Sequence, residues 1–305
     1  MELVPGTRVG RYILEERLGA GGAGEVFRVV DERAGTTHAL KVHSTLSSGQ
    51  RARLLREGRT QSTLCHPNIV RVTDFVTVGR RPGIVMEHVD GPDLATLIRT
   101  QTVSVRGLDA VVRGILSGVH AAHCLGLVHR DLKPSNILLA RAGDGYVPKV
   151  ADFGLVLVDD DHRRTRTGQP MGTPSYMAPE QIRDAKRVDQ RADIWALGAI
   201  LYELVTRQRA FRADNLLSLF LRIADGAFTP VGDHAPSAPL RMARAIEDAL
   251  VVDLDDRIPD CERLWALWSS PTDTDAELPP PPALLSIDSE AENLILETRP
   301  TALRD

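Results

Sequence analysis

The spacing of hydrophobic residues changes along the chain. In the first third, short segments rich in valine, isoleucine and phenylalanine are bounded by glycine or proline, which is typical of β-strands. These segments are Tyr12–Leu18, Glu25–Asp31, His38–His43, Ile69–Val78 and Gly83–His88. Arg51–Leu64 interrupts them with apolar residues at helical spacing. The pattern predicts a small antiparallel sheet with one helix.

Longer helical patterns dominate after residue 93. Apolar residues recur at helical spacing in Leu108–Leu125, Asp189–Val205 and Leu216–Ala224. We therefore predict an α+β protein in which a small β-rich lobe precedes a larger, mainly helical lobe. The expected boundaries are an N-terminal extension at 1–11, the small lobe at 12–89 and the large lobe at 90–270.

The composition changes near residue 270. Residues 271–305 contain eight acids, two arginines and six prolines, so this segment carries −6 and the preceding residues carry +2. Such a composition predicts a flexible acidic tail that builds no core of its own. The alternative is a docking or phospho-recognition site for a partner, formed by Leu294–Leu296 between acids or by Thr298 and Thr301.

Charge and cysteine content exclude several classes of protein. A net charge of −4 over 305 residues argues against a mainly electrostatic nucleic-acid or membrane binder. The longest strongly apolar stretch, Ile194–Val205, is too short to span a bilayer, which takes about 20 residues. No secretory signal is recognised, so we expect a cytoplasmic protein with no nucleic-acid or membrane partner. The three cysteines are odd in number and far apart in the sequence, so we expect neither a disulfide frame nor a zinc site. They are Cys65, Cys124 and Cys261.

Arginine supplies nearly all of the positive charge. Only four of the 37 basic residues are lysines, namely Lys41, Lys133, Lys149 and Lys186. Such a bias is typical of a GC-rich genome, so a lysine at a chemical position is informative. We expect Lys149 and Lys186 to be solvated.

A glycine-rich segment joins the first two predicted strands. It reads Leu18-Gly19-Ala20-Gly21-Gly22-Ala23-Gly24-Glu25-Val26. Glycines let the backbone approach a polyphosphate and point N–H groups toward it. A dinucleotide site would need a helix directly after the glycines, whereas Glu25–Val30 has the pattern of a strand, which favours a hairpin over phosphates. A turn without a ligand is the alternative.

Four further motifs follow in order. They are Ala39-Leu40-Lys41, His129-Arg130-Asp131-Leu132-Lys133-Pro134-Ser135-Asn136, Asp152-Phe153-Gly154 and Ala178-Pro179-Glu180. With these motifs, the sequence from about Tyr12 to Trp268 closely resembles the eukaryotic-type protein kinase superfamily, in particular its bacterial serine/threonine branch. The resemblance implies the two-lobed kinase fold and transfer of the ATP γ-phosphate to serine or threonine hydroxyls of protein substrates.

The same resemblance assigns residues to the nucleotide. Lys41 is expected to contact the α- and β-phosphates, held by a carboxylate on the first helix. Glu57 is the candidate partner, because the competing Glu15 and Glu32 lie outside that helix. Residues 18–26 would cover the phosphates. The adenine would pack between Val26, Ala39 and Leu138, with Met86 at the back of the pocket and backbone groups of Glu87 and Val89 at its edge. A plain strand end is the alternative for residues 87–89.

The catalytic roles follow the family template as well. Asp131 would orient the acceptor hydroxyl and take its proton, with Lys133 at the γ-phosphate. A lysine ammonium is a compact point charge, whereas an arginine guanidinium is a planar fork, so an arginine would place its charge differently against a phosphate oxygen. Asn136 and Asp152 would supply oxygen ligands to Mg²⁺, or to Mn²⁺ in its place. The implied cofactors are therefore ATP and Mg²⁺.

Arg130, directly before Asp131, indicates control by a phosphate on the activation segment. Thr165 and Thr167, between arginines, are the candidate autophosphorylation sites. The resemblance also implies residues that support the fold and take no part in the chemistry. These residues are Thr173, Glu180, Asp193 and Arg257.

Two other classes compete with a protein kinase. A pseudokinase-like scaffold or partner-binding module would commonly have lost a motif residue, whereas Lys41, Asp131, Asn136 and Asp152 are all present. A kinase-fold enzyme acting on a small molecule would not need Gly172–Glu180, which resembles the peptide-docking element of protein kinases.

Overall fold

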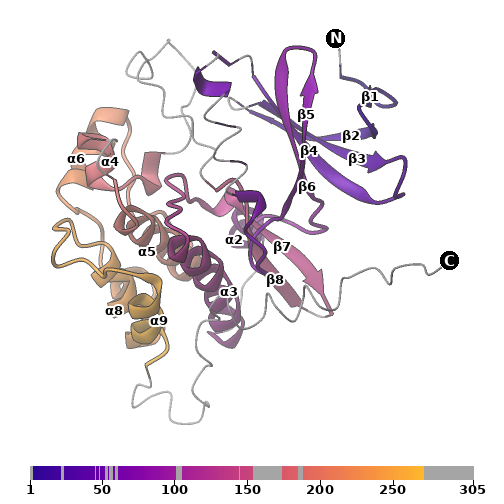
Figure 1. The fold of residues 1–305 in the computed structure, drawn as a ribbon. Helices are drawn as coiled ribbons and strands as arrows, with labels where there is room; N and C mark the ends of the chain where they lie inside the picture. Colours follow the sequence, from indigo (N-terminus) through magenta and orange to yellow (C-terminus); the bar gives the residue numbers. More distant parts are fainter. Residues whose placement is uncertain are drawn as a thin grey trace.

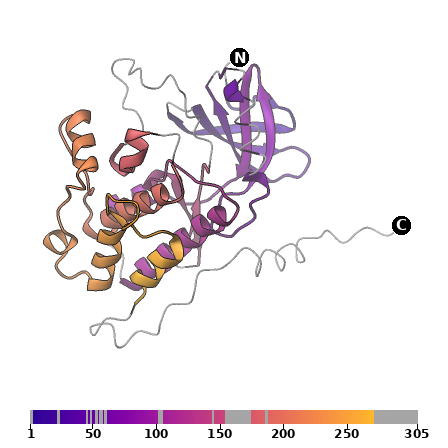
Figure 2. The same ribbon diagram turned by 60° about the vertical axis from the view of Figure 1, so that its left-hand side comes forward.

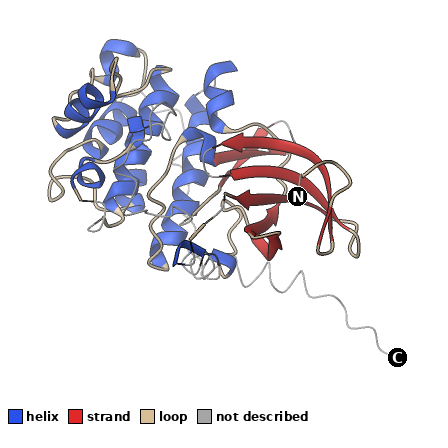
Figure 3. Ribbon diagram, turned by 90° about the horizontal axis from the view of Figure 1, so that it is seen from above, coloured by secondary structure: helices blue, strands red, loops and turns tan. Residues whose placement is uncertain are grey.

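The protein is divided into a lobe of strands and a lobe of helices (Figures 1 and 3). The computed structural model describes residues 3–21, 24–44, 46–47, 49–51, 54, 58, 61–100, 105–143, 145–153, 174–184 and 188–270. The strand lobe comes from the start of the chain, and the helical lobe from the remainder. This is the predicted α+β, two-lobed architecture, which is confirmed.

The smaller lobe is built on a six-stranded antiparallel sheet with the order β1-β2-β3-β4-β6-β5. Its strands are β1 (Arg8–Val9), β2 (Tyr12–Gly21), β3 (Gly24–Asp31), β4 (Thr37–His43), β5 (Val72–Val78) and β6 (Arg81–Glu87). Alternate residues of β3 and β4 are buried on one face, among them Phe27, Val29, Leu40 and Val42. Such alternation is expected of a strand, because successive side chains point to opposite faces of a sheet.

The segment before β5 departs from the prediction. The strand expected at Ile69–Val78 begins only at Val72, because Ile69 forms an isolated parallel bridge with Val150 in the other lobe. Half of the residues in the helix expected at Arg51–Leu64 lie outside the described part. Residues 51, 54, 58, 61 and 62 are helical, whereas 63 and 64 are not, and Leu54 is fully buried against the sheet.

The larger lobe contains α2 (Leu94–Thr100), α3 (Val105–Cys124), α4 (Pro179–Arg183), α5 (Arg191–Thr206), α6 (Leu216–Ala224), α7 (Val231–His234), α8 (Leu240–Ala249) and α9 (Cys261–Trp268). The predicted helices correspond to α3, α5 and α6. Figure 2 shows the helices from a second side, with α9 alongside α3. α5 is buried on nearly all sides, as expected of a helix that is apolar around its circumference. None of the helices in the described part combines the length and apolar character needed to cross a bilayer.

Side-chain caps define where some helices start. α6 follows Asn215, whose side-chain oxygen accepts a hydrogen bond from the Ser218 N–H. α9 follows Asp260, which accepts one from the Arg263 N–H in the same way. Each cap satisfies a backbone donor that the first helical turn leaves without a partner.

A two-stranded hairpin brings the helical lobe to the sheet. It consists of β7 (Ile137–Ala142) and β8 (Gly145–Val150) and packs on α3. The Val70 N–H donates to the Val150 oxygen at 2.9 Å, and the Val150 N–H donates to the Asn68 oxygen at 2.8 Å. These bonds bring the residues that follow β8 to the sheet, where Asp152 lies next to Lys41 of β4.

Candidate active site

The glycine-rich segment forms the end of the β2–β3 hairpin. Gly21 pairs with Gly24 and Ala20 with Glu25, so the strands continue into the segment. A strand and not a helix therefore follows the glycines, which rules out the dinucleotide arrangement. Gly22 and Ala23 lie outside the described residues. Leu18, at the start of the segment, is 47% exposed.

The described glycines of this hairpin differ in what requires them. At Gly24, φ is +139° and an added Cβ would lie 2.1 Å from the backbone oxygen of Val42. This close approach to β4 excludes any side chain. At Gly19 and Gly21, no atom lies within 4 Å of an added Cβ. Gly24 is thus needed by the sheet itself, whereas Gly19 and Gly21 leave open space over the hairpin.

The residues expected around an adenine lie in one apolar cluster between the lobes. Ala39 and Met86 are buried there together with Ala151, which precedes Asp152. The partly buried side chains packed on this cluster include Val26, Val89 and Leu138. The predicted residues in this cluster come from β3, β4, β6, the linker after β6 and the β7–β8 hairpin, so the structure brings Val26, Ala39, Met86, Val89 and Leu138 together.

The linker after β6 is held by contacts of Glu87. The Glu87 N–H donates to the Arg71 oxygen at 2.9 Å, and the Glu87 carboxylate accepts from the Arg71 N–H at 3.0 Å. Since its N–H is already used, any contact from the backbone of residue 87 to an adenine edge would be made by the carbonyl.

Lys41 pairs with Asp152 across the two lobes. The Lys41 Nζ lies 2.7 Å from the Asp152 Oδ2, and the lysine side chain is 13% exposed. Burial raises the pKa of Asp152, but the charge and hydrogen bond of Lys41 outweigh it, so the pKa is lowered overall. The Asp152 carboxylate is therefore ionised at neutral pH. Glu57, the predicted partner of Lys41, lies outside the described residues.

The loop before β7 gathers three polar side chains. The Lys133 Nζ donates to the Asp131 Oδ2 at 2.6 Å. The Asn136 Nδ2 donates to the Asp131 backbone oxygen at 2.8 Å and to its Oδ2 at 3.3 Å. Among the contacts given by the described residues, those of the Asp131 carboxylate fall on Oδ2, which leaves Oδ1 for an incoming hydroxyl. The Asn136 contacts use its nitrogen, so its amide oxygen is left for a cation.

Asp193, at the start of α5, holds this loop by accepting hydrogen bonds from its backbone. Its Oδ2 accepts from the His129 N–H at 2.7 Å and from the His123 Nε2 at 2.8 Å, and its Oδ1 accepts from the Arg130 N–H at 2.8 Å. Arg130 and Asp152 both have positive φ, 67° and 64°. Non-glycine residues hold this conformation only where the surroundings enforce it. The bonds to Asp193 provide that support at Arg130.

His129 links the loop to the segment that carries Asp152. Its Nε2 donates to the Ala151 oxygen at 2.8 Å, and its Nδ1 accepts from the Asp131 N–H at 3.3 Å. The ring is fully buried and packs against Phe153. His129 and His123 were not among the predicted site residues. The sequence signal for His129 was its place in the His-Arg-Asp motif, whereas nothing in the local pattern distinguished His123.

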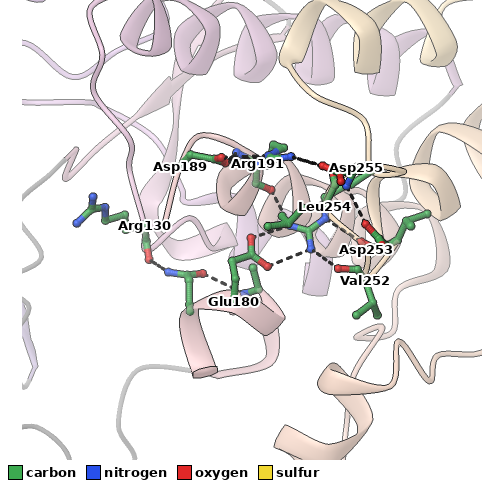
Figure 4. A network of polar contacts seen from close by, with 12 residues as sticks. Arg130, Glu180, Asp189, Arg191, Val252, Asp253, Leu254 and Asp255 are labelled. Carbon is green, nitrogen blue, oxygen red and sulfur yellow. Dashed lines mark hydrogen bonds and ion pairs between the residues drawn. The ribbon is translucent and has the colours of Figure 1, made fainter. Parts of the chain in front are cut away.

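Glu180 and Arg257 form the buried ion pair that the resemblance implied (Figure 4). The Arg257 guanidinium donates twice to the Glu180 carboxylate, at 2.8 and 3.0 Å. Its three other N–H contacts reach backbone oxygens of Arg191, Val251 and Val252. Figure 4 also shows the Arg130 side chain extending away from this network, with its backbone oxygen toward it. That oxygen accepts from the Gln181 Nε2 at 2.8 Å.

The expectation for Lys149 was wrong. The Lys149 side chain is 19% exposed, and its Nζ lies 2.9 and 3.2 Å from the two carboxylate oxygens of Glu87. Sequence pattern could not show this pair, because its residues belong to different lobes. The other predicted residues that lie outside the described part are Gly154, Thr165, Thr167, Thr173, Lys186 and the acidic tail 271–305, which includes Leu294–Leu296, Thr298 and Thr301.

Comparison with known proteins identifies the family. The Protein kinase domain family matches residues 12–258. The serine/threonine-protein kinase PknL of Mycobacterium tuberculosis is 38% identical over 213 residues, which are 68% of this chain and 52% of that protein. The DNA damage-responsive serine/threonine-protein kinase RqkA of Deinococcus radiodurans is 36% identical over 277 residues, 88% of this chain and 41% of that protein. The chain thus spans about half or less of the length of these relatives.

Solved structures agree with this match. The kinase domain of Mycobacterium tuberculosis PknI superposes with a TM-score of 0.69 at 26% identity, covering 88% of this chain and 98% of that one. Rad53 residues 1–466, in complex with AMP-PNP, superposes with a TM-score of 0.70 at 27% identity, covering 84% and 64%. The residues matched by the family, 12–258, include the glycine-rich hairpin, the Asp131 loop and the Glu180–Arg257 pair. The chain therefore belongs to the protein kinase domain family.

Proposed function

We propose that this protein is a protein serine/threonine kinase that transfers the γ-phosphate of ATP to hydroxyls of protein substrates. The observation that carries the proposal is the Asp131 carboxylate, which has Lys133 and Asn136 on one oxygen and the other oxygen open. The similar kinases named above act on serine and threonine, and the similar Rad53 structure contains AMP-PNP. Both support the proposed substrates.

The residues present fit Mg²⁺ as the metal that accompanies ATP. Asp152 is an ionised carboxylate and Asn136 has its amide oxygen available, and Mg²⁺ is bound by one or two such groups together with substrate phosphates. When bound, the metal would neutralise charge on the phosphates. Mn²⁺ suits the same oxygen donors.

Each residue of the site has a separate role in the proposed transfer. Lys41 and Lys133 place positive charges on the two sides of the Asp131–Asp152 region, where phosphate charge must be stabilised. Asp131 holds the acceptor hydroxyl by its open oxygen and takes the proton as the new phosphate ester forms. Asp193 accepts hydrogen bonds from the backbone of His129 and Arg130, which fix the loop, so Asp131 is in place before the substrate arrives.

The test is phosphate transfer from labelled ATP with Mg²⁺ by the purified protein, beside Asp131→Asn and Lys41→Arg. We expect labelling of the wild-type protein and of a serine- or threonine-containing substrate, and a loss of at least about a hundredfold in each variant. Equal labelling of all three proteins would overturn the assignment. Nucleotide binding without any transfer by the wild type would instead favour the pseudokinase-like scaffold.

Activation by phosphorylation of the activation segment is a further part of the proposal. Arg130 lies beside Asp131, and its side chain makes only a long contact with the Val188 oxygen, at 3.5 Å, among the described residues. A phosphate on Thr165 or Thr167 would offer it a stronger, charge-assisted partner. Mass spectrometry of active protein should find at least one of these threonines modified; neither being modified would contradict this.

The proposal extends to the ends of the chain and to its location. We expect a cytoplasmic protein whose catalytic part is residues 12–270, preceded by an extension at 1–11, without nucleic-acid or membrane partners. The acidic tail 271–305 would act as a flexible segment that offers a docking or phospho-recognition site. Deleting 271–305 should leave transfer to a generic peptide intact and weaken binding of a physiological partner. Unchanged partner binding would remove the docking role.

A further inference from the structure

The third lysine of the chain lies at the nucleotide site, although it faces no phosphate-binding residue. We propose that Lys149 is a positioning residue for the adenine, acting through its ion pair with Glu87. This inference rests on the proposed function, since it concerns the nucleotide of that same site. It gives a specific role to a side chain that the family motifs leave unassigned.

Glu87 is held from both lobes. On the sheet side, it exchanges two hydrogen bonds with the backbone of Arg71. On the other side, both of its carboxylate oxygens accept from the Lys149 Nζ. The two side chains are 30% and 19% exposed, so solvent screens this pair less than it screens pairs on the open surface. Further along the linker, the backbone is joined to β7, because the Arg141 N–H donates to the Asp90 oxygen at 3.1 Å and the Leu139 N–H donates to the Pro92 oxygen at 2.9 Å. At residue 87 itself, the contact with the helical lobe among the described residues is the one with Lys149.

Lys149 also joins two walls of the apolar cluster. Its backbone pairs with Leu138 in the β7–β8 hairpin, and Leu138 packs on that cluster from the helical lobe. Its side chain reaches residue 87, whose carbonyl would meet the adenine edge. Lys149 therefore links the strand pair that carries Leu138 to residue 87, in addition to the backbone bonds that join the later linker residues to β7. Lys149 precedes Asp152 by three positions, but its charge is engaged by Glu87.

This geometry predicts which step depends on the pair. The linker would contact the adenine and not the transferring phosphate, so loss of the pair should weaken ATP and ADP binding alike. The rate of transfer at saturating ATP should change little. A lysine that merely stabilised the fold would not confine its effect to nucleotide affinity.

The experiment compares Lys149→Met with wild type, Lys149→Arg and Glu87→Gln. Dissociation constants for Mg-ATP and Mg-ADP are measured by titration calorimetry, and kcat and the peptide KM are measured at saturating ATP. Thermal melting verifies that each variant is folded. Arg28→Met is the matched control, because it removes an exposed ion pair with Glu15 on the same sheet.

We expect Lys149→Met and Glu87→Gln each to raise both dissociation constants about fivefold, as for one partly buried ion pair. Lys149→Arg should stay near wild type, since a guanidinium can also bridge the carboxylate. In a variant that carries both Lys149→Met and Glu87→Gln, the dissociation constants should be little higher than in either single variant.

Unchanged nucleotide affinity in folded Lys149→Met or Glu87→Gln, with normal binding by the wild type, would overturn this inference alone. An equal loss in the Arg28→Met control would do the same, because the effect would then not be specific to the linker. A wild-type protein that binds no nucleotide would overturn the proposed function, and this inference with it.

Discussion

Arg257 offers a graded test of how the helical lobe is held together. Its side chain is fully buried, and all five of its N–H groups donate, two to Glu180 and three to backbone oxygens. The guanidinium carbon also lies 5.0 Å from the centre of the Trp195 ring. Arg257→Met would leave the Glu180 carboxylate, itself only 16% exposed, without a partner.

The structure sets the size of the effect. Removing one partner of a buried ion pair costs about 3–5 kcal/mol, because the other charge stays buried. Arg257→Lys keeps the charge but has three N–H groups in place of five, so at least two bonds are lost at about 1 kcal/mol each. For a domain of this size, 1 kcal/mol corresponds to roughly 2–4 °C in melting temperature. We therefore expect melting to fall by roughly 6–20 °C in Arg257→Met and by less in Arg257→Lys.

Calorimetric melting at fixed pH and scan rate measures both variants against the wild type. Arg8→Met is the control, because its pair with Glu32 is exposed and such pairs contribute little. A shift below about 2 °C in Arg257→Met, or equal melting of the lysine variant and the wild type, would refute the argument from burial and bond number.

Three further predictions follow from single contacts. Asp193→Asn replaces an oxygen that accepts backbone N–H bonds, so kcat should fall about tenfold or more while circular dichroism stays native; undiminished kcat would contradict this. Burial lowers the pKa of His66 from 6.5 to about 4, with Lys149 adding to the effect. The unfolded chain therefore binds a proton that the folded protein refuses, so stability should fall as the pH decreases from 6.5 to 4. Urea unfolding at several pH values should show a shallower slope for His66→Gln; an equal slope would exclude this residue as the cause. Gly24→Ala should lower the melting temperature because of the close β4 backbone, whereas Gly19→Ala should not; equal melting of the two would refute the distinction.

The sequence alone determined the parts of this protein that depend on near neighbours. The valine, isoleucine and phenylalanine content of Tyr12–Leu18 and Glu25–Asp31, together with the glycines between them, predicted two strands, and the structure joins them as the β2–β3 hairpin. Asp131, Lys133 and Asn136 lie within one short loop, so their order along the chain already placed them together. Segment composition and loop length are local properties, and local sequence can therefore encode them.

The same local pattern was insufficient where a contact depended on another element of the fold. The strand expected from Ile69 starts late, because Ile69 bridges to Val150. The helix at Arg51–Leu64 was predicted from the helical spacing of its apolar residues, whereas the burial of Leu54 depends on the sheet against which it packs. Propensity describes what a segment can form, whereas packing against other segments selects its ends.

Only the tertiary structure decided which charges meet. Glu180 and Arg257 are 77 residues apart in the chain, and Glu87 and Lys149 are 62 apart. The first pair was expected from family resemblance, whereas the second contradicted the expectation that Lys149 is solvated. No period or spacing within a segment specifies such a pair, because its distance is set by how the β7–β8 hairpin packs against the sheet. The chemically reactive residues of this protein thus lie in short sequence motifs, whereas their positions relative to one another depend on contacts between elements that are distant in sequence.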